Sequence, residues 1–295
     1  DRLPGDGETI IGKSFKMFPG GKGFNQAVQA ARLGAQVEMV GCLGNDANGE
    51  VMLEAAKKEG IGTAHIRVAD DISTAVGNVQ LFTTTGGVQN RIIVVPGANM
   101  RLTTDDVAFL ADEASNFDAV LLQLEIPMEV NEAAAAYAAA ANVPVMLNPA
   151  PSAVLSDVLL GNIDCILPNE TEAAQLSGIP IARGERGLDP SDVRKAAVKL
   201  MERGVKQVLV TLGNAGSAYY AKEVEITCPI VPEYESVDPT AAGDSYIGAF
   251  TVAKSAGYSV SQSMQIASMA AGVTVSRMGG FPALPRAEEI GFIMR

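Results

Sequence analysis

Apolar and polar positions along the chain predict an α/β protein. Four apolar runs have the length of buried strands: 119–124, 144–147, 164–167 and 207–212. Helical spacing of apolar residues recurs over 24–33, 49–59, 104–114, 129–142, 191–203, 243–256 and 259–276. Because apolar strands that alternate with helices form parallel sheets, we expect a mostly parallel central sheet with helices on both faces.

The first third of the chain has a different pattern. Residues 8–18, 75–83 and 90–95 resemble strands with one polar face, whereas 37–43 resembles a buried strand. We interpret the polar-faced strands, within 8–18 and 75–95, as a small β-sheet lid beside the core. No linker and no repeat of about 20–50 residues divides the chain, so residues 1–295 are predicted to form a single domain.

Polar or glycine-rich residues follow five predicted strands. They are Glu125, Asn148, the stretch 168–172, the stretch 211–216, and 238–244 after a strand predicted to end at Val237. In open α/β sheets ligands bind beyond the carboxyl ends of the strands. One polar loop is unremarkable, but five at the same edge predict a site.

The stretch DPTAAGDSYIGAF, 238–250, predicts the start of a helix near Ala241–Asp244. The first N–H groups of a helix lack partners, and Ala241, Ala242 and Gly243 leave them open to an anion such as a phosphoryl group. Asp244 either complements the helix dipole or accepts a proton during phosphoryl transfer. The dipole is expected to keep Asp244 ionised.

A second stretch, PGGKGFNQA at 19–27, contains Gly20, Gly21 and Gly23, which permit close backbone approaches. Lys22 and Asn25 offer donors to hydroxyl groups. The alternative is a strand-to-helix turn with a solvated lysine. The spacing of a P-loop is absent, as is G-x-G-x-x-G.

Three further polar residues have two interpretations. Glu125 either accepts hydrogen bonds from a polyol or is a charge at the rim of the sheet. Asn169 and Glu172 either help to hold hydrated Mg²⁺ with nucleotide phosphates or form a capping pair on a helix over 170–177. We interpret His65, the single histidine, as structural.

Composition excludes several classes of function. The net charge is −12 and no basic stripe is present, so no nucleic-acid partner is expected. Three scattered cysteines without a CxxC motif indicate reduced thiols in the cytoplasm rather than a disulfide framework or a zinc site. No apolar run approaches the roughly 18 residues of a spanning helix, so no membrane partner is expected.

The chain resembles the PfkB-type, or ribokinase-like, carbohydrate kinases. The resemblance runs from about residue 3 to the C-terminus and is carried by GGKGFNQA at 20–27 and DPTAAGDSYIGAF at 238–250. Further support comes from PGAN at 96–99, LNPAP at 147–151, PNETE at 168–172 and TLGNAG at 211–216. These motifs are more similar to members that phosphorylate ribose than to fructokinases or nucleoside kinases. The resemblance implies ATP-dependent phosphorylation of the primary hydroxyl of D-ribose, with Mg²⁺, a monovalent activator, usually K⁺, and a homodimer paired through the lid.

The resemblance also implies residue roles. Asp244 would be the catalytic base, with an anion hole from Ala241, Ala242 and Gly243. The sugar would be bound by Gly21, Lys22, Gly23, Asn25, Glu125 and Asp244. The ATP site would include Asn169, Thr211, Gly213, Asn214, Gly216, Gly243 and Ser268, the last of which matches a histidine in some relatives. Asp238, Thr240, Thr274, Arg277, Gly279 and Ala283 would hold the monovalent cation, and Glu172 would act on Mg²⁺ indirectly.

The chain departs from the family pattern in two places. The family opens with a core strand ending in an Asn and an Asp that bind sugar hydroxyls, and that segment would lie several residues before Asp1. Phe24 stands where alanine is common, and its ring is expected to narrow the choice of sugar.

Other functions remain open on the sequence. Within the family these are phosphorylation of fructose, deoxyribose or a 2-keto-3-deoxy sugar acid, although no arginine is placed for the carboxylate of that acid. A non-catalytic sugar- or nucleotide-binding protein is disfavoured because Asp244 is retained. A nicotinamide dehydrogenase is disfavoured by the missing glycine fingerprint.

Overall fold

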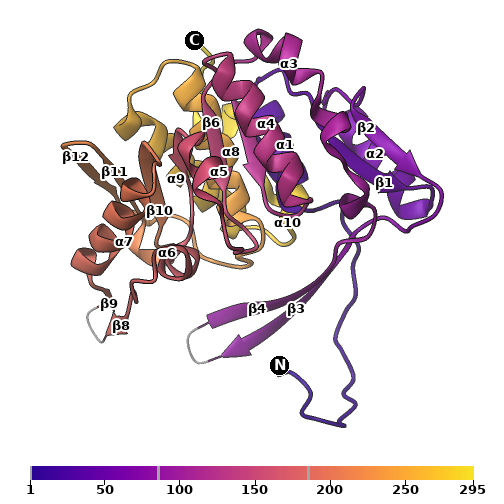
Figure 1. Ribbon diagram of the computed structural model, residues 1–295. Helices are drawn as coiled ribbons and strands as arrows, with labels where there is room; N and C mark the ends of the chain where they lie inside the picture. The colour runs from indigo at the N-terminus through magenta and orange to yellow at the C-terminus, as the bar shows by residue number, and fades with distance from the viewer. Residues whose placement is uncertain (1, 85–86, 185–186) are drawn as a thin grey trace.

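A six-stranded sheet in the order β12-β11-β10-β7-β6-β5 forms the centre of the protein (Figure 1). The computed structural model describes residues 2–84, 87–184 and 187–295. The strands are β5 (Val120–Gln123), β6 (Val145–Asn148), β7 (Cys165–Ile166), β10 (Gln207–Thr211), β11 (Ser217–Ala221) and β12 (Val224–Cys228). The first four pair in parallel, and β11 and β12 are antiparallel. The predicted mostly parallel sheet is confirmed.

Helices cover both faces of this sheet, as predicted. Successive residues of β10 point to opposite sides, so Val208 and Val210 pack in one core cluster and Leu209 in another. The first face is covered by α4 (Met128–Ala140), α5 (Asp157–Gly161), α6 (Glu170–Ser177) and α7 (Pro190–Glu202). The second is covered by α1 (Lys22–Arg32), α8 (Ala242–Ser255) and α9 (Val260–Val275).

A separate two-stranded parallel sheet joins β1 (Gly41–Gly44) to β2 (Ile66–Ala69). The helix α2 (Ala47–Lys58) lies between them in the sequence. The strand predicted over 37–43 is therefore shorter and shifted, although Glu38 forms an isolated bridge with Gly62. No apolar signal had pointed to β2, which is exposed at two of its four positions.

An antiparallel ribbon of β3 (Val76–Thr84) and β4 (Gly87–Val95) projects from the body of the protein (Figure 1). It matches the lid strands predicted over 75–83 and 90–95. The prediction of a strand over 8–18 is wrong, because that segment has no strand geometry and no paired neighbour. Ile11 is 98% exposed. An extended segment is not stable without a neighbouring strand to pair with. Among the described strands, β3 and β4 pair with each other and not with residues 8–18.

The strand predicted to end at Val237 is also wrong. The sheet edge is completed earlier by the β11–β12 hairpin, and Pro229 and Pro232 then interrupt the chain.

Residues 104–114, predicted as one helix, divide into short helical pieces. The short elements are η1 (Gly97–Arg101), η2 (Thr104–Val107), α3 (Leu110–Glu113), η3 (Ala114–Asn116), β8 (Arg183–Gly184), β9 (Gly187–Leu188), η4 (Gly213–Ala215), α10 (Gly280–Ala283) and η5 (Ala287–Ile290). Among the described helices, none has the length and apolar character needed to cross a bilayer.

Candidate active site

The N-terminus of α8 opens into a large cavity beside the ends of the central strands. Ala241 is the residue before the helix, with a left-handed backbone (φ 62°) that costs a residue other than glycine about 1–2 kcal/mol. No side chain caps this end. The helix begins where the sequence predicted, and strained backbone at a helix end is typical of functional sites.

Only part of the predicted anion hole has free amides. The N–H of Ala242 donates to the carbonyl of Pro239 at 3.3 Å, so it is engaged within the turn. Within the described part of the chain, the N–H groups of Gly243 and Asp244 have no acceptor. A Cβ atom built on Gly243 would meet nothing within 4 Å. Two open amides at a helix N-terminus can therefore receive an anion at close range.

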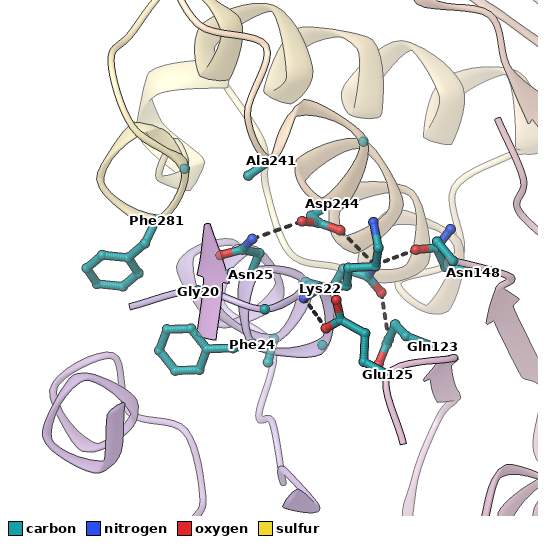
Figure 2. Close-up of a pocket in the computed structure, with 18 of the residues that line it drawn as sticks. Gly20, Lys22, Phe24, Asn25, Gln123, Glu125, Asn148, Ala241, Asp244 and Phe281 are labelled. Carbon is teal, nitrogen blue, oxygen red and sulfur yellow. Dashed lines mark hydrogen bonds between the residues drawn. The ribbon is translucent and has the colours of Figure 1, made fainter. Parts of the chain in front are cut away.

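Asp244 is buried, and two side-chain amides hold its carboxylate (Figure 2). Asn25 Nδ2 donates to Oδ2 at 2.9 Å, and Gln26 Nε2 donates to Oδ1 at 3.1 Å. Burial raises the pKa of Asp244, while the charge of Lys22 and the two donated bonds oppose the rise. Desolvation is the largest of these effects, so the carboxyl group of Asp244 is a stronger base than the helix dipole by itself would make it.

The glycine-rich stretch forms the start of α1, opposite α8. Gly21 precedes the helix with φ 95°, a conformation that favours glycine. The N–H of Lys22 donates to Glu125 Oε2 at 2.9 Å, and burial raises the pKa of Glu125 against this bond and the charge of Lys22. Glu125 is thus a partly buried carboxylate that faces α1 and the cavity rather than a fully exposed charge at the rim.

The cavity brings most of the predicted residues together. Its lining includes Gly21, Lys22, Gly23, Asn25, Glu125, Asn169, Glu172, Thr211, Asp238, Thr240, Ala241, Gly243, Asp244 and Gly279. It does not include Ala242, Gly213, Asn214, Gly216, Ser268, Thr274, Arg277 or Ala283. The predicted sugar, base and phosphoryl residues, apart from Ala242, therefore share one cavity, and the outer nucleotide and cation residues lie beyond it.

Asn169 and Glu172 form the capping pair of α6. The Asn169 side chain accepts from the N–H of Glu172 at 2.8 Å, and the Glu172 side chain accepts from the N–H of Asn169 at 2.9 Å. Burial raises the pKa of Glu172, and the charge of Lys22 lowers it. The capping interpretation is confirmed, and the same pair also faces the cavity.

The loop after β10 lies against the loop that carries Asn169. Thr211 N donates to the carbonyl of Pro168 at 3.0 Å. The fold requires glycine at position 216, because a Cβ atom there would lie 2.0 Å from the carbonyl oxygen of Cys228. Ser268 on α9 lies behind this loop, 3.5 Å from the sulfur of Cys228.

Asp238 organises the predicted cation loops. It is 2% exposed, and its two oxygens accept from the N–H groups of Thr240 and Gly279, each at 2.9 Å. Among the described residues, the buried hydroxyl of Thr240 has no hydrogen-bond partner. The hydroxyl oxygen of Thr274 lies 2.8 Å from Ser245 Oγ and 2.8 Å from the carbonyl oxygen of Ala270, and Arg277 pairs with Glu289 at 2.5 Å. Ala283 is buried in α10.

Sequence reasoning did not single out Gln26 or Gln123. Both side chains belong to the hydrogen-bond network around Asp244, and Gln26 lay inside a motif already quoted.

Phe24 is buried against Phe281, with 5.8 Å between ring centroids. Figure 2 shows these two rings facing each other, apart from the hydrogen-bonded groups at Asp244. His65 stacks on Phe109 at 3.7 Å, which fits its structural interpretation.

Within the described residues, no three histidine, cysteine, aspartate or glutamate side chains are grouped closely enough to hold a metal ion. A magnesium ion here would therefore depend on ligand phosphates and water as well as on Glu172.

Comparison with known proteins places this site in a family. Residues 1–287 match the model of the pfkB family carbohydrate kinases. The chain is 36% identical over 285 residues to the ribokinase of Haemophilus influenzae, covering 96% of this chain and 89% of that protein. A structure of Arabidopsis thaliana ribokinase complexed with ribose and ATP is 36% identical and has a TM-score of 0.85, covering 98% of this chain and 91% of that one. A Thermotoga maritima ribokinase structure is 33% identical with a TM-score of 0.83, covering 99% and 92%. The chain therefore belongs to the PfkB family of carbohydrate kinases, which are phosphotransferases with an alcohol group as acceptor.

Proposed function

We propose that the protein transfers the γ-phosphoryl group of ATP to the primary hydroxyl of D-ribose, giving ribose 5-phosphate and ADP. One observation carries the proposal: Asp244 lines the same cavity as Lys22 and Glu125, at the end of α8 where the N–H groups of Gly243 and Asp244 have no acceptor among the described residues. Relatives at 34–37% identity that are named ribokinase support ribose as the acceptor.

The residues divide the reaction between them. The hydroxyl oxygen of the sugar attacks the γ-phosphorus, its proton passes to Asp244, and the bond to the bridging oxygen breaks, so that its electron pair leaves with ADP. The N–H groups of Gly243 and Asp244 stabilise the negative charge of the phosphoryl group during transfer. Lys22, Asn25 and Glu125 orient the sugar, with Gly21 and Gly23 permitting its approach. Positioning matters more than base strength, because the transition state is loose.

The nucleotide is proposed to lie along the loops after β7 and β10, near Asn169 and Thr211, with Gly213, Asn214, Gly216 and Ser268 at its outer end. Mg²⁺ would neutralise phosphate charge, with Glu172 acting through water. K⁺ would be held by the loops of Asp238 and Gly279, with Thr240, Thr274, Arg277 and Ala283 nearby. The unpartnered buried hydroxyl of Thr240 supports this assignment.

Two properties of the whole protein are also proposed. The exposed apolar side chains of β3 and β4, with Ile92 at 52% and Ile93 at 62%, support a homodimer paired through the lid. Sedimentation of wild type and of Ile93→Lys tests the proposed dimer, since a charge on the face of β4 that carries Ile93 should favour the monomer.

The cysteines at 42, 165 and 228 are free and buried, which supports a reducing, cytoplasmic location.

The test is release of ADP from ATP and Mg²⁺ with D-ribose, fructose, deoxyribose or a 2-keto-3-deoxy sugar acid, each with and without K⁺. We expect the highest kcat/KM with ribose, and Asp244→Asn should lower kcat by about 10²–10⁴-fold with ATP affinity nearly intact. A preference for another sugar would reassign the substrate. Tight ribose binding without ADP release would instead indicate a non-catalytic binding protein.

A further inference from the structure

Gln26 joins three parts of the active site through one buried amide. It lies on α1 and is fully buried. Its Nε2 atom donates to Asp244 Oδ1 and to Asn148 Oδ1, each at 3.1 Å, and its Oε1 atom accepts from Gln123 Nε2 at 2.7 Å. Both polar atoms of the side chain are therefore engaged, and Gln26 has no free group to offer a substrate.

The neighbours of Gln26 determine which way its amide faces. Asn148 Nδ2 donates to the carbonyl of Leu167 at 3.0 Å, which directs its oxygen toward Gln26. Gln123 Nε2 also reaches the carbonyl of Leu121 at 3.4 Å, so this amide must donate to the oxygen of Gln26. These backbone carbonyls belong to the central sheet region. One N–H of Gln26 is consequently held toward Asp244, where it favours the ionised form, and the other points to Asn148.

Asn25, the other amide on Asp244, is different. Its Nδ2 atom donates to Oδ2 of the carboxylate at 2.9 Å, but its own Oδ1 is buried without a hydrogen-bond partner among the described residues. That oxygen is available to accept from a sugar hydroxyl, whereas the polar atoms of Gln26 are already engaged by Asp244, Asn148 and Gln123. The geometry points to Gln26 as a positioning residue, oriented by Gln123 and Asn148, that fixes the rotamer and the ionised state of the Asp244 carboxylate; this rests on the proposed role of Asp244 as base.

The charged side chains around Asp244 act on its carboxylate in opposite directions, so its ionised form also depends on the side-chain amides. Lys22 on α1 is the cation that acts on Asp244, and Glu125 and Glu172 are carboxylates in the same cavity that interact unfavourably with it. Lys22 thus interacts with three carboxylates, those of Asp244, Glu125 and Glu172. Removal of the hydrogen bond that Gln26 donates to the Asp244 carboxylate should therefore raise the proton affinity of this carboxylate by a large amount.

The test compares Gln26→Leu with Gln29→Leu. Gln29 is also fully buried on α1, but it donates to the carbonyl of Pro285 and accepts from Ser245 rather than contacting Asp244. We expect Gln26→Leu to move the acid limb of the pH profile of kcat/KM upward by about 1–2 units and to lower kcat at least tenfold, with KM for the sugar little changed. Gln29→Leu should lose stability without moving the acid limb.

A second readout needs no substrate. Carboxyl NMR titration of Asp244 should show the same upward shift of its pKa in Gln26→Leu and none in Gln29→Leu. If this shift is found while wild type turns over no sugar, the proposed function fails and the structural role of Gln26 stands. If Gln26→Leu does not fold, Gln123→Leu, which frees the Gln26 amide to turn, should give a smaller shift of the same sign. An unmoved Asp244 titration in the folded variant would overturn the inference.

Discussion

Asn25 and Asp244 are 219 residues apart in the sequence, yet 2.9 Å separates Asn25 Nδ2 from Asp244 Oδ2. The bond forms because α1 packs directly on α8. One turn after Asp244, Gly248 has no side chain, and a Cβ atom there would lie 2.8 Å from the carbonyl oxygen of Gln26. The glycine thus sets the separation of the two helices at which the amides of α1 reach the carboxylate.

Gly248→Ala should therefore reduce both stability and activity. The added methyl group also meets Gln29 Cβ at 3.0 Å, so α1 must move away, and overpacking of this kind costs about 1–3 kcal/mol. Displacement of Asn25 and Gln26 should lower kcat. Ala249→Gly is a matched control on the side of α8 that faces the sheet, and it should cost about 1 kcal/mol with kcat unchanged. Equal loss of kcat in both variants would count against the packing argument.

The raised pKa of Asp244 predicts where activity fails in acid. The base must be ionised to accept the hydroxyl proton, so kcat/KM should fall as the pH drops through the raised pKa, above the value of about 3.9 for a free aspartate. Lys22 stabilises the ionised form, so Lys22→Met should move this acid limb to still higher pH. A pH series of kcat/KM for the sugar checks both, and an acid limb at or below the ordinary aspartate range would contradict them.

Gly243→Ala separates folding from catalysis at the anion hole. The new methyl group has open space around it, and alanine is favoured over glycine in a helix, so the melting temperature should stay equal or rise. That open space is the cavity itself, so the methyl group would obstruct the approach of the phosphoryl group. We expect kcat/KM for ATP to fall about 10²-fold or more, as when an oxyanion donor is lost.

Gly161→Ala provides the control for this prediction. Its Cβ atom would also meet nothing within 4 Å, but Gly161 ends α5 and does not line the cavity. Calorimetry and steady-state kinetics on both variants measure the two effects. Full activity in Gly243→Ala would remove this amide from phosphoryl binding.

The sequence predicted the elements of the site better than their contacts. Small residues before a helical period located the start of α8 and hence Asp244, and the polar residues at the ends of β5, β6, β7 and β10 indicated the right edge of the sheet. These are local patterns, and local patterns report secondary structure. The bonds from Asn25 and Gln26 to Asp244 depend on tertiary packing between segments more than 200 residues apart, for which a single sequence carries no signal.

What the sequence did not predict has the same origin. For Asp244 the sequence indicated only the helix dipole, whereas the burial that raises its pKa comes from α1 and the rest of the fold. A strand over 8–18 needs a paired neighbour, which the alternation of its own residues could not supply. The left-handed conformation at position 241 is adopted by an alanine, and without a glycine there the sequence does not indicate that conformation. Pairing, burial and backbone strain are properties of the folded chain.

The Arg32–Glu59 pair should contribute to stability far more than the surface pairs. The two side chains are 9% and 5% exposed and are joined by two hydrogen bonds, from Nε at 3.0 Å and from Nη2 at 2.7 Å. Arg32 Nη1 also donates to the carbonyls of Phe281 and Leu284, which ties α1 to the segment after Gly279. Glu59→Gln leaves a buried arginine unpaired, so we expect a loss of about 3–5 kcal/mol in the free energy of unfolding.

The effect of this pair should depend on pH with a definite sign. Arg32 lowers the pKa of Glu59 in the folded protein, so the stabilisation is present above the unfolded pKa of about 4.3 and is lost as the pH falls through the lowered folded value. Denaturant titrations of wild type and Glu59→Gln should therefore differ at pH 7 and converge in acid. Glu225→Gln, which breaks the exposed pair with Arg194, should change stability by less than about 1 kcal/mol. A difference between wild type and Glu59→Gln that persists undiminished in acid would show that the lost stability comes from packing and not from the charge of Glu59.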